Sequence, residues 1–211
     1  MSQRFVDHLD AVIPGRMAEL HIPGVALALV GGDAIAEVRV YGIRDVQRGL
    51  PITTATRFSL QSISKSFCAW AVMKLVEDGL VDLDAPINTY LRRWKLADSQ
   101  YPASQVTVRR LLCHHGGISS SGIDSVLPDQ HGCTLIDGLN GTLPPLTEEQ
   151  ARYYRLWNLG PGQPVVIERE PGAGWQYANG GYAMLELMIE DVTGRSYGDF
   201  MRSEILAPLG L

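Results

Sequence analysis

Ser62 and Lys65 are the residues whose types and spacing suggest chemistry most directly. They stand three positions apart at the start of an apolar run that ends at Gly79, a pattern typical of a helix buried on nearly every side. Side chains three apart lie on neighbouring ridges of a helix, so this hydroxyl and this amine can come within hydrogen-bond reach. The amine could then take the serine proton, which makes the hydroxyl a usable nucleophile. The pair therefore indicates acyl transfer through Ser62.

Two lysines of this predicted helix stand in different sequence surroundings. Lys65 has no acidic neighbour in sequence, and burial in an apolar core would favour the neutral form of its amine. Lys74 lies near the helix C-terminus beside Glu77 and Asp78, where a solvated cation is expected. The alternative for Ser62 is a helix N-cap, because serine often fills that position and Ser-x-x-Lys also arises by chance.

Tyr177 and Asn179 form a second candidate pair, in a turn-rich loop over residues 171–182. An apolar helix is expected to follow over 183–192, closed by Gly194. The two side chains alternate on an extended segment, so both can point into one cleft. A phenol can share or relay the proton of a nucleophile, and a carboxamide offers a donor and an acceptor to a substrate amide. The alternative is a structural tyrosine in a glycine-rich turn.

Three stretches of the chain resemble the serine β-lactamase and penicillin-binding-protein superfamily, closest to its class C and esterase-like branch. They are residues 58–67, 107–118 and 171–182, the last followed by 190–194 and 208–210. Their order and spacing match across nearly the whole chain. The resemblance implies an α+β fold of the β-lactamase/transpeptidase type, with a helical domain beside an antiparallel sheet and its flanking helices.

The resemblance also implies roles for the candidate residues. Ser62 would be the acylated nucleophile, Lys65 its general base and Tyr177 the tyrosine that assists proton transfer. Asn179 would bind substrate or Lys65, and the backbone N–H of Ser62 would donate to the oxyanion. No metal or organic cofactor is implied. The expected reaction is hydrolysis of a small ester or amide, with an esterase favoured over a β-lactamase or a peptidase for D-amino-acid peptides.

One family element is missing downstream of the tyrosine motif. The family carries a Lys-Thr-Gly or His-x-Gly strand there, whereas this chain has no lysine after Lys95 and no histidine after His131. We therefore expect the N-terminal part of a longer enzyme, or a truncated product, with an incomplete sheet. An open sheet edge would favour self-association, poor solubility or inactivity. The alternative function is a catalytically inactive ligand-binding or regulatory module of the same fold.

Composition agrees with a globular enzyme and argues against several other classes. The chain has 211 residues, of which 45% are hydrophobic and 19% charged, enough for a sizeable core. The net charge of −5 and the lack of a basic run argue against a nucleic-acid partner. No signal-peptide core or bilayer-length apolar stretch is visible, and three cysteines are an odd count. These features favour a cytoplasmic protein with reduced thiols and no membrane partner.

The chain is expected to fall into three segments. Residues 1–60 would hold an opening helix over 4–20, kinked at Pro14, and a hairpin of strands 24–30 and 35–41. Residues 61–170 would be mainly helical with long active-site loops, including short helices over 106–113 and 147–156. Residues 171–211 would hold the tyrosine motif and returning helices. The loop-rich stretch 116–164 would form part of the substrate rim.

Two further clusters have a functional and a structural interpretation. The possible zinc ligands are Cys113, His114, His115, His131 and Cys133. Their spacing is not usual for zinc, so a structural turn after a helix is favoured. The aromatic residues Tyr153, Tyr154, Trp157 and Trp175 could line an acyl pocket, but aromatic residues near helix ends are more often core.

Overall fold

The computed structural model describes residues 3–119, 134–142, 147–148, 152 and 163–211. The chain divides into two compact units, Met1–Leu60 (unit 1) and Gln61–Leu211 (unit 2). Unit 1 contains α1 (Gln3–Glu19), β1 (Gly24–Gly31), β2 (Ala34–Asp45) and β3 (Leu50–Pro51). The helices that the structure describes in unit 2 are η1 (Gln61–Ile63), α2 (Ser64–Glu77), η2 (Ile87–Thr89), η3 (Ala103–Gln105), α3 (Val108–Leu112), α4 (Leu135–Asn140), α6 (Asn179–Thr193), α7 (Tyr197–Phe200), η4 (Met201–Leu206) and η5 (Ala207–Leu209).

Unit 1 is built on an antiparallel hairpin, as the sequence predicts. β1 pairs with β2 from Gly24↔Gly42 to Gly31↔Ala34, and the register shifts between Leu29 and Val30. The turn between the strands contains Gly32, whose φ of 63° is readily adopted by glycine. β3 adds two residues on the other side of β2, giving the order β1-β2-β3. The outer edge of β1 is thus unpaired among the described residues, and self-association through it stays a prediction.

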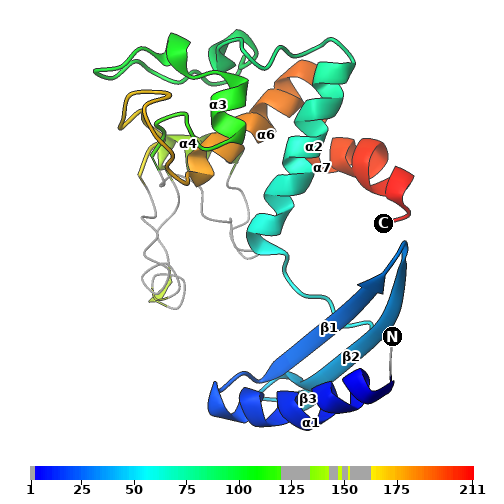
Figure 1. Cartoon of the computed structure of the whole chain (residues 1–211). Helices are drawn as coiled ribbons and strands as arrows, with labels where there is room; N and C mark the ends of the chain where they lie inside the picture. Colours follow the sequence, from blue (N-terminus) through cyan, green and yellow to red (C-terminus); the bar gives the residue numbers. More distant parts are fainter. Residues whose placement is uncertain (1–2, 120–133, 143–146, 149–151, 153–162) are drawn as a thin grey trace. The chain divides into compact units, whose positions relative to one another are not determined.

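α1 covers the hairpin and continues through Pro14 from Gln3 to Glu19 (Figure 1). Its Asp10 accepts a hydrogen bond of 2.6 Å from the Tyr41 hydroxyl of β2. Among the described residues of unit 1, the buried hydrophobic side chains are Val6 and Ile52. This unit therefore has a thin core.

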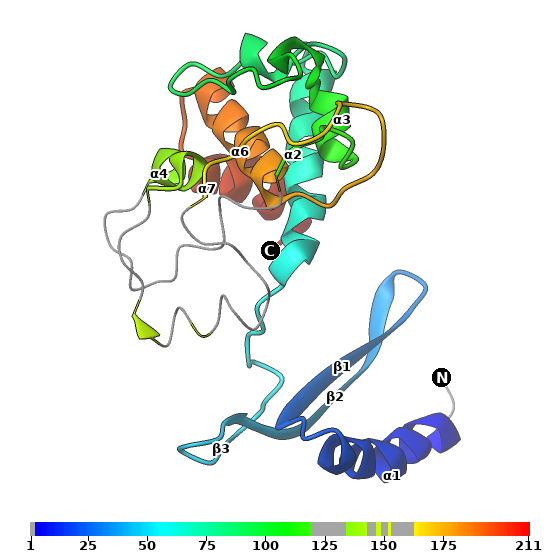
Figure 2. The same ribbon diagram turned by 90° about the vertical axis from the view of Figure 1, so that its left-hand side faces the viewer.

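Unit 2 has a dense core centred on α6, with α2, α3, α4 and α7 packed around it (Figure 2). The side chains that are almost wholly excluded from solvent are Leu75, Ile87, Leu91, Leu111, Ile118, Leu139, Met184, Leu185, Leu187, Met188 and Ile189. α6 ends at Gly194, which adopts φ 69° as its left-handed C-cap. The sequence predicts both this stop and the apolar run before it.

α2 is helical as predicted, but the prediction that it is buried on nearly every side is wrong. Cys68, Ala71, Val72 and Leu75 face the core. Trp70 is 51% exposed and Met73 is 44% exposed. Among the described residues of unit 2, α2 packs chiefly against α6 and η4.

Two short helices are fixed by side chains at their first turns. Thr107 caps α3 by accepting from the backbone N–H of Arg110, inside the helix predicted over 106–113. α4, which the sequence analysis did not predict, begins with a capping box between Thr134 and Asp137. The capping box predicted at Thr147 falls largely on residues outside the described part of the chain.

A buried carboxylate joins the far end of α6 to the segment after η2. Asp191 accepts hydrogen bonds from the backbone N–H groups of Arg92, at 2.6 Å, and Arg93, at 3.2 Å. The Arg93 guanidinium also pairs with it at 2.5 Å. Burial alone would raise the pKa of Asp191, but these donors outweigh it and lower the pKa. The network holds α6 in place at the end remote from Asn179.

Candidate active site

Ser62 lies in the 3-10 turn η1, just before α2 begins at Ser64. The preceding residue, Gln61, has a φ of 47°, a left-handed conformation that costs a non-glycine residue about 1–2 kcal/mol. The N-cap position of α2 is Ile63, and no side chain caps it by a hydrogen bond. The N-cap alternative for Ser62 is therefore wrong.

Three polar groups converge at the Ser62 hydroxyl. Lys65 Nζ donates a hydrogen bond to Ser62 Oγ over 3.1 Å. The Tyr177 hydroxyl lies 2.5 Å from the same oxygen, and either atom of this pair can be the donor. The structure thus brings the lysine and the tyrosine, distant in sequence, to one serine oxygen. These are the three side chains to which the sequence analysis assigns catalytic roles, and those roles remain a prediction.

Lys65 lies against aromatic rings and is half-buried, so the expectation that it enters an apolar core is wrong. Its Nζ is 4.9 Å from the ring centroid of Tyr177 and 5.6 Å from that of Tyr182. Lys74, by contrast, lies 3.1 Å from an Asp78 carboxylate oxygen, which raises the pKa of Lys74. The two lysines of α2 therefore have different partners, as their sequence surroundings predict.

Asn179 is the first residue of α6 and lines an open pocket of about 300 Å³ together with Lys65. The lining residues are Ser64, Lys65 and Cys68 from α2, Asn179, Tyr182, Ala183 and Glu186 from α6, and Tyr197 from α7. Burial, and to a lesser extent Glu190, raise the pKa of Glu186 to about 7. Glu186 was not predicted from the sequence, because an acidic residue inside an apolar helix gives no local sign of which groups face it.

The candidate zinc cluster is divided between described and undescribed residues. Among the described residues, no group of three or more histidine, cysteine or acidic side chains could hold a metal. Cys113, His114 and His115 lie at the end of α3 and just beyond it. His131 and Cys133 lie outside the described residues, so the five-residue site stays an untested alternative.

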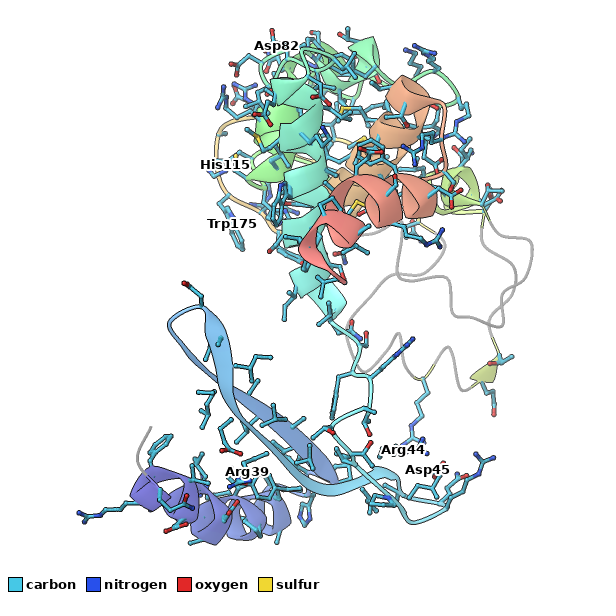
Figure 3. The ribbon with its side chains drawn as sticks, turned by 90° about the vertical axis from the view of Figure 1, so that its right-hand side faces the viewer. Arg39, Arg44, Asp45, Asp82, His115 and Trp175 are labelled. Carbon is cyan, nitrogen blue, oxygen red and sulfur yellow. The ribbon has the colours of Figure 1, made fainter. Side chains whose placement is uncertain are left out.

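Of the candidate pocket aromatics, the structure describes Trp175. Its side chain is 63% exposed and lies on the same side of unit 2 as His115 (Figure 3). Its ring meets that of His114 edge-on, with 6.1 Å between the ring centroids. Trp175 is thus a surface residue of the loop that contains Tyr177. Tyr153, Tyr154 and Trp157 lie outside the described residues.

The beta-lactamase family model matches residues 9–211. The chain belongs to the beta-lactamase family. Penicillin-binding protein 4* of Bacillus subtilis is 28% identical over 211 residues, which are 100% of this chain and 42% of that protein. The chain spans about two-fifths of the length of the curated relatives that it matches.

Solved structures of beta-lactamase family relatives share the fold. The octameric penicillin-binding protein homologue from Pyrococcus abyssi matches with a TM-score of 0.70 and 33% identity, over 97% of this chain and 43% of that one. D-amino acid amidase from Ochrobactrum anthropi SV3, in complex with D-phenylalanine, matches with a TM-score of 0.69 and 28% identity, over 96% and 50%. The α+β fold of the β-lactamase/transpeptidase type is therefore confirmed. In the part of the chain that the structure describes, no helix is long and apolar enough to cross a membrane.

Proposed function

We propose that this chain carries the nucleophile of a serine hydrolase that acts on a small ester or amide. In this proposal the Ser62 oxygen attacks the substrate carbonyl and forms an acyl-enzyme. The observation that supports it most strongly is the convergence on Ser62 Oγ of Lys65 Nζ, at 3.1 Å, and of the Tyr177 hydroxyl, at 2.5 Å. A hydroxyl nucleophile needs a proton acceptor within hydrogen-bond reach. Here Lys65 and Tyr177 are both candidates for that acceptor.

The proton path follows from these contacts. As the Ser62 Oγ–carbon bond forms, the hydroxyl proton moves to a neutral Lys65 amine, and the Tyr177 hydroxyl bridges to the leaving group. The leaving alcohol or amine takes this proton from Lys65, through the Tyr177 hydroxyl, as its bond to carbon breaks. Water then attacks the acyl-enzyme and gives one proton to the Lys65 amine. As the Ser62 Oγ–carbon bond breaks and the acid product departs, Ser62 Oγ takes that proton back from Lys65. No cofactor is needed for this sequence of steps.

Two further roles belong to the same proposal. The backbone N–H of Ser62 would donate to the carbonyl oxygen as negative charge develops on it. Asn179 lines the same pocket as Lys65, which supports a role in holding either the substrate amide or the lysine. The likeness to D-amino acid amidase supports an amide as one substrate class to test.

A covalent probe tests the nucleophile. The wild-type chain, a Ser62→Ala variant and a Ser66→Ala variant are incubated with a fluorophosphonate, and intact mass and peptide mapping locate the adduct. Ser66 is the matched control, because it is an exposed serine on α2. We expect the adduct on Ser62 in the wild type and in Ser66→Ala, and none in Ser62→Ala.

The same samples discriminate between enzyme and binding module. A folded wild-type chain that takes up no probe would favour the inactive ligand-binding alternative. If the adduct forms, p-nitrophenyl acetate, D-phenylalanine amide and nitrocefin would then distinguish esterase, amidase and β-lactamase activity. Turnover of p-nitrophenyl acetate is the result that the sequence analysis favours.

A further inference from the structure

His114 occupies an unusual backbone position next to the tyrosine loop. It follows Cys113, the C-cap residue of α3, and has a φ of 59°. Non-glycine residues adopt this left-handed conformation at a cost, so surrounding contacts must hold it. Gly117, three residues on, has a φ of 67°, and a Cβ there would collide with the Arg169 carbonyl oxygen. This turn is therefore closely determined by its neighbours.

His114 contacts Tyr177 and the two residues that flank it. Its carbonyl oxygen accepts the Gln176 N–H over 2.8 Å. Its Nδ1 accepts the Ala178 N–H over 3.2 Å. The imidazole ring also packs against the Tyr177 ring, with 4.5 Å between centroids and 37° between planes. His114 thus binds the backbone of both residues that flank Tyr177 and packs against the tyrosine ring.

From these contacts we infer that His114 is a positioning residue, which aims the Tyr177 hydroxyl at Ser62 and does so only while its imidazole is neutral. The inference rests on the proposed function, because it assigns Tyr177 a part in the reaction. His114 itself does not touch the reacting atoms in this account. It acts through the tyrosine, whose hydroxyl lies 2.5 Å from Ser62 Oγ.

The contact with Ala178 determines which tautomer is present. A backbone N–H only donates, so Nδ1 must be unprotonated and the ring proton must lie on Nε2. Burial, followed by the charges of Lys65 and His115, lowers the pKa of His114. The imidazole ring of His114 is therefore neutral at neutral pH. The contacts of His114 with Gln176, Tyr177 and Ala178, here called the clamp, require this form.

Acid would release the clamp. The groups that face the imidazole are Lys65 from α2, Tyr182 from α6, Tyr177 and Trp175 from the loop, and neighbouring His115. None of the described groups in this set is a carboxylate that would stabilise an imidazolium. Protonation at Nδ1 would turn an acceptor into a donor facing the Ala178 N–H. It would also place a positive charge near Lys65, whose amine becomes positive when it takes the Ser62 proton.

Three variants distinguish the effect of the His114 Nδ1 acceptor from the effect of its aromatic ring. His114→Asn keeps an oxygen acceptor close to the Nδ1 position, tolerates the left-handed backbone and does not titrate near neutral pH. His114→Phe keeps an aromatic ring but has no acceptor. His115→Asn is the matched control, because His115 Nδ1 contacts the Cys113 carbonyl oxygen at 2.8 Å instead of a backbone group beside Tyr177. Circular dichroism checks that each variant is folded.

The rate constant for fluorophosphonate labelling is measured for each protein from pH 4.5 to 8. We expect His114→Phe to react about 10- to 100-fold more slowly than wild type at every pH, within the range for a misaligned catalytic group. His114→Asn should stay within about tenfold of wild type at pH 7.5 and lose less of its rate in acid. His115→Asn should react at the wild-type rate at pH 7.5, with at most a small shift of its acid limb, because the charge of His115 is the smallest of the causes that lower the pKa of His114.

Nitrogen chemical shifts of wild-type protein containing ¹⁵N-histidine give a measurement that does not depend on reaction with the fluorophosphonate. The expected spectrum at pH 7.5 shows His114 with Nδ1 unprotonated and Nε2 protonated. An Nδ1–H tautomer, or a charged ring at that pH, would overturn the inference. So would a His114→Phe variant that reacts like wild type, or His114→Asn and His114→Phe slowed equally. If wild type takes up no probe, the proposed function fails, whereas the tautomer measurement still decides whether the clamp exists.

Discussion

α2 and α6 are helices of similar length and similarly apolar sequence, yet they are buried to different extents. α6 buries nine of its residues and is surrounded by α2, α3, α4 and α7. α2 buries four and leaves Trp70 and Met73 exposed. Apolar composition alone therefore does not decide how many sides of a helix are covered, because that depends on which elements pack against it.

The candidate site lies where the N-terminal ends of these two helices meet. The α2 end provides Ser62 and Lys65, and the α6 end provides Tyr177 and Asn179. The central helix is fixed along its length by core packing and by Asp191 at its far end. The two helices therefore differ in their surroundings: α6 is the buried helix of the core, whereas the less buried α2 follows Ser62, the proposed nucleophile.

Replacing each lysine of α2 by methionine tests this difference most strongly. Lys65→Met should slow fluorophosphonate labelling by about 10²- to 10⁴-fold, the range for loss of a general base. Lys74→Met should label at the wild-type rate, because Lys74 pairs with Asp78 at the other end of the helix. Labelling kinetics at pH 7.5 measure both. Equal effects of the two changes would show that the ends of α2 do not differ as described.

A core truncation on α6 should mainly affect stability. Leu187 is wholly buried, so Leu187→Ala should lower the free energy of unfolding by about 2–5 kcal/mol. Met73→Ala on the exposed face of α2 is the matched change, with an expected loss of about 0.5 kcal/mol. Urea denaturation followed by circular dichroism gives both values. Similar losses at the two positions would contradict the different burial of the helices.

Because Glu186 lines the pocket between α2, α6 and α7, we expect the free energy of unfolding to depend on pH. Its pKa is raised to about 7 in the folded chain from an ordinary value of 4.5. Between these values the unfolded chain releases the proton that the folded chain keeps, so stability falls as pH rises and then levels off above about 7. Glu186→Gln should remove this part of the slope.

Melting temperatures between pH 4.5 and 8.5 measure the effect. Glu77→Gln is the control, because Glu77 is an exposed carboxylate on α2. Its melting profile should remain parallel to that of wild type. A Glu186→Gln profile that is also parallel to wild type would mean that the carboxyl is solvated in both states.

The smallest expected effect is at the exposed face of α2. Trp70→Ser should change the free energy of unfolding by only about 0.5 kcal/mol, because the side chain is half exposed. Labelling of Ser62 should be unaffected. Urea denaturation measures the stability, and a loss several times larger would show that this face is covered in solution.

Local signals in the sequence were enough to predict several elements. The hairpin of unit 1 follows from two β-rich runs around Gly32, and the end of α6 follows from Gly194. The Ser62, Lys65 and Tyr177 cluster was also predicted, through helix spacing and the family resemblance. The structure adds the distances between these side chains, while their catalytic roles remain the proposal tested above.

What the sequence could not predict depends on contacts between distant segments. The exposure of Trp70 follows from the packing partners of α2, which periodicity does not identify. His114 drew attention only as a doubtful metal ligand, because its bonds to Gln176 and Ala178 join segments far apart in the chain. Glu186 was missed for the same reason, because its raised pKa comes from burial beside a pocket that residues from several helices form.

The left-handed Gln61 also limits how this site could be engineered into another protein. Grafting the Ser-x-x-Lys motif onto a regular α-helix would place the serine inside that helix. In this chain Ser62 instead lies in a 3-10 turn just before α2. The graft would have to include the unfavourable backbone angle at position 61 and enough surrounding scaffold to enforce it. The transferable unit is therefore a bend leading into a helix.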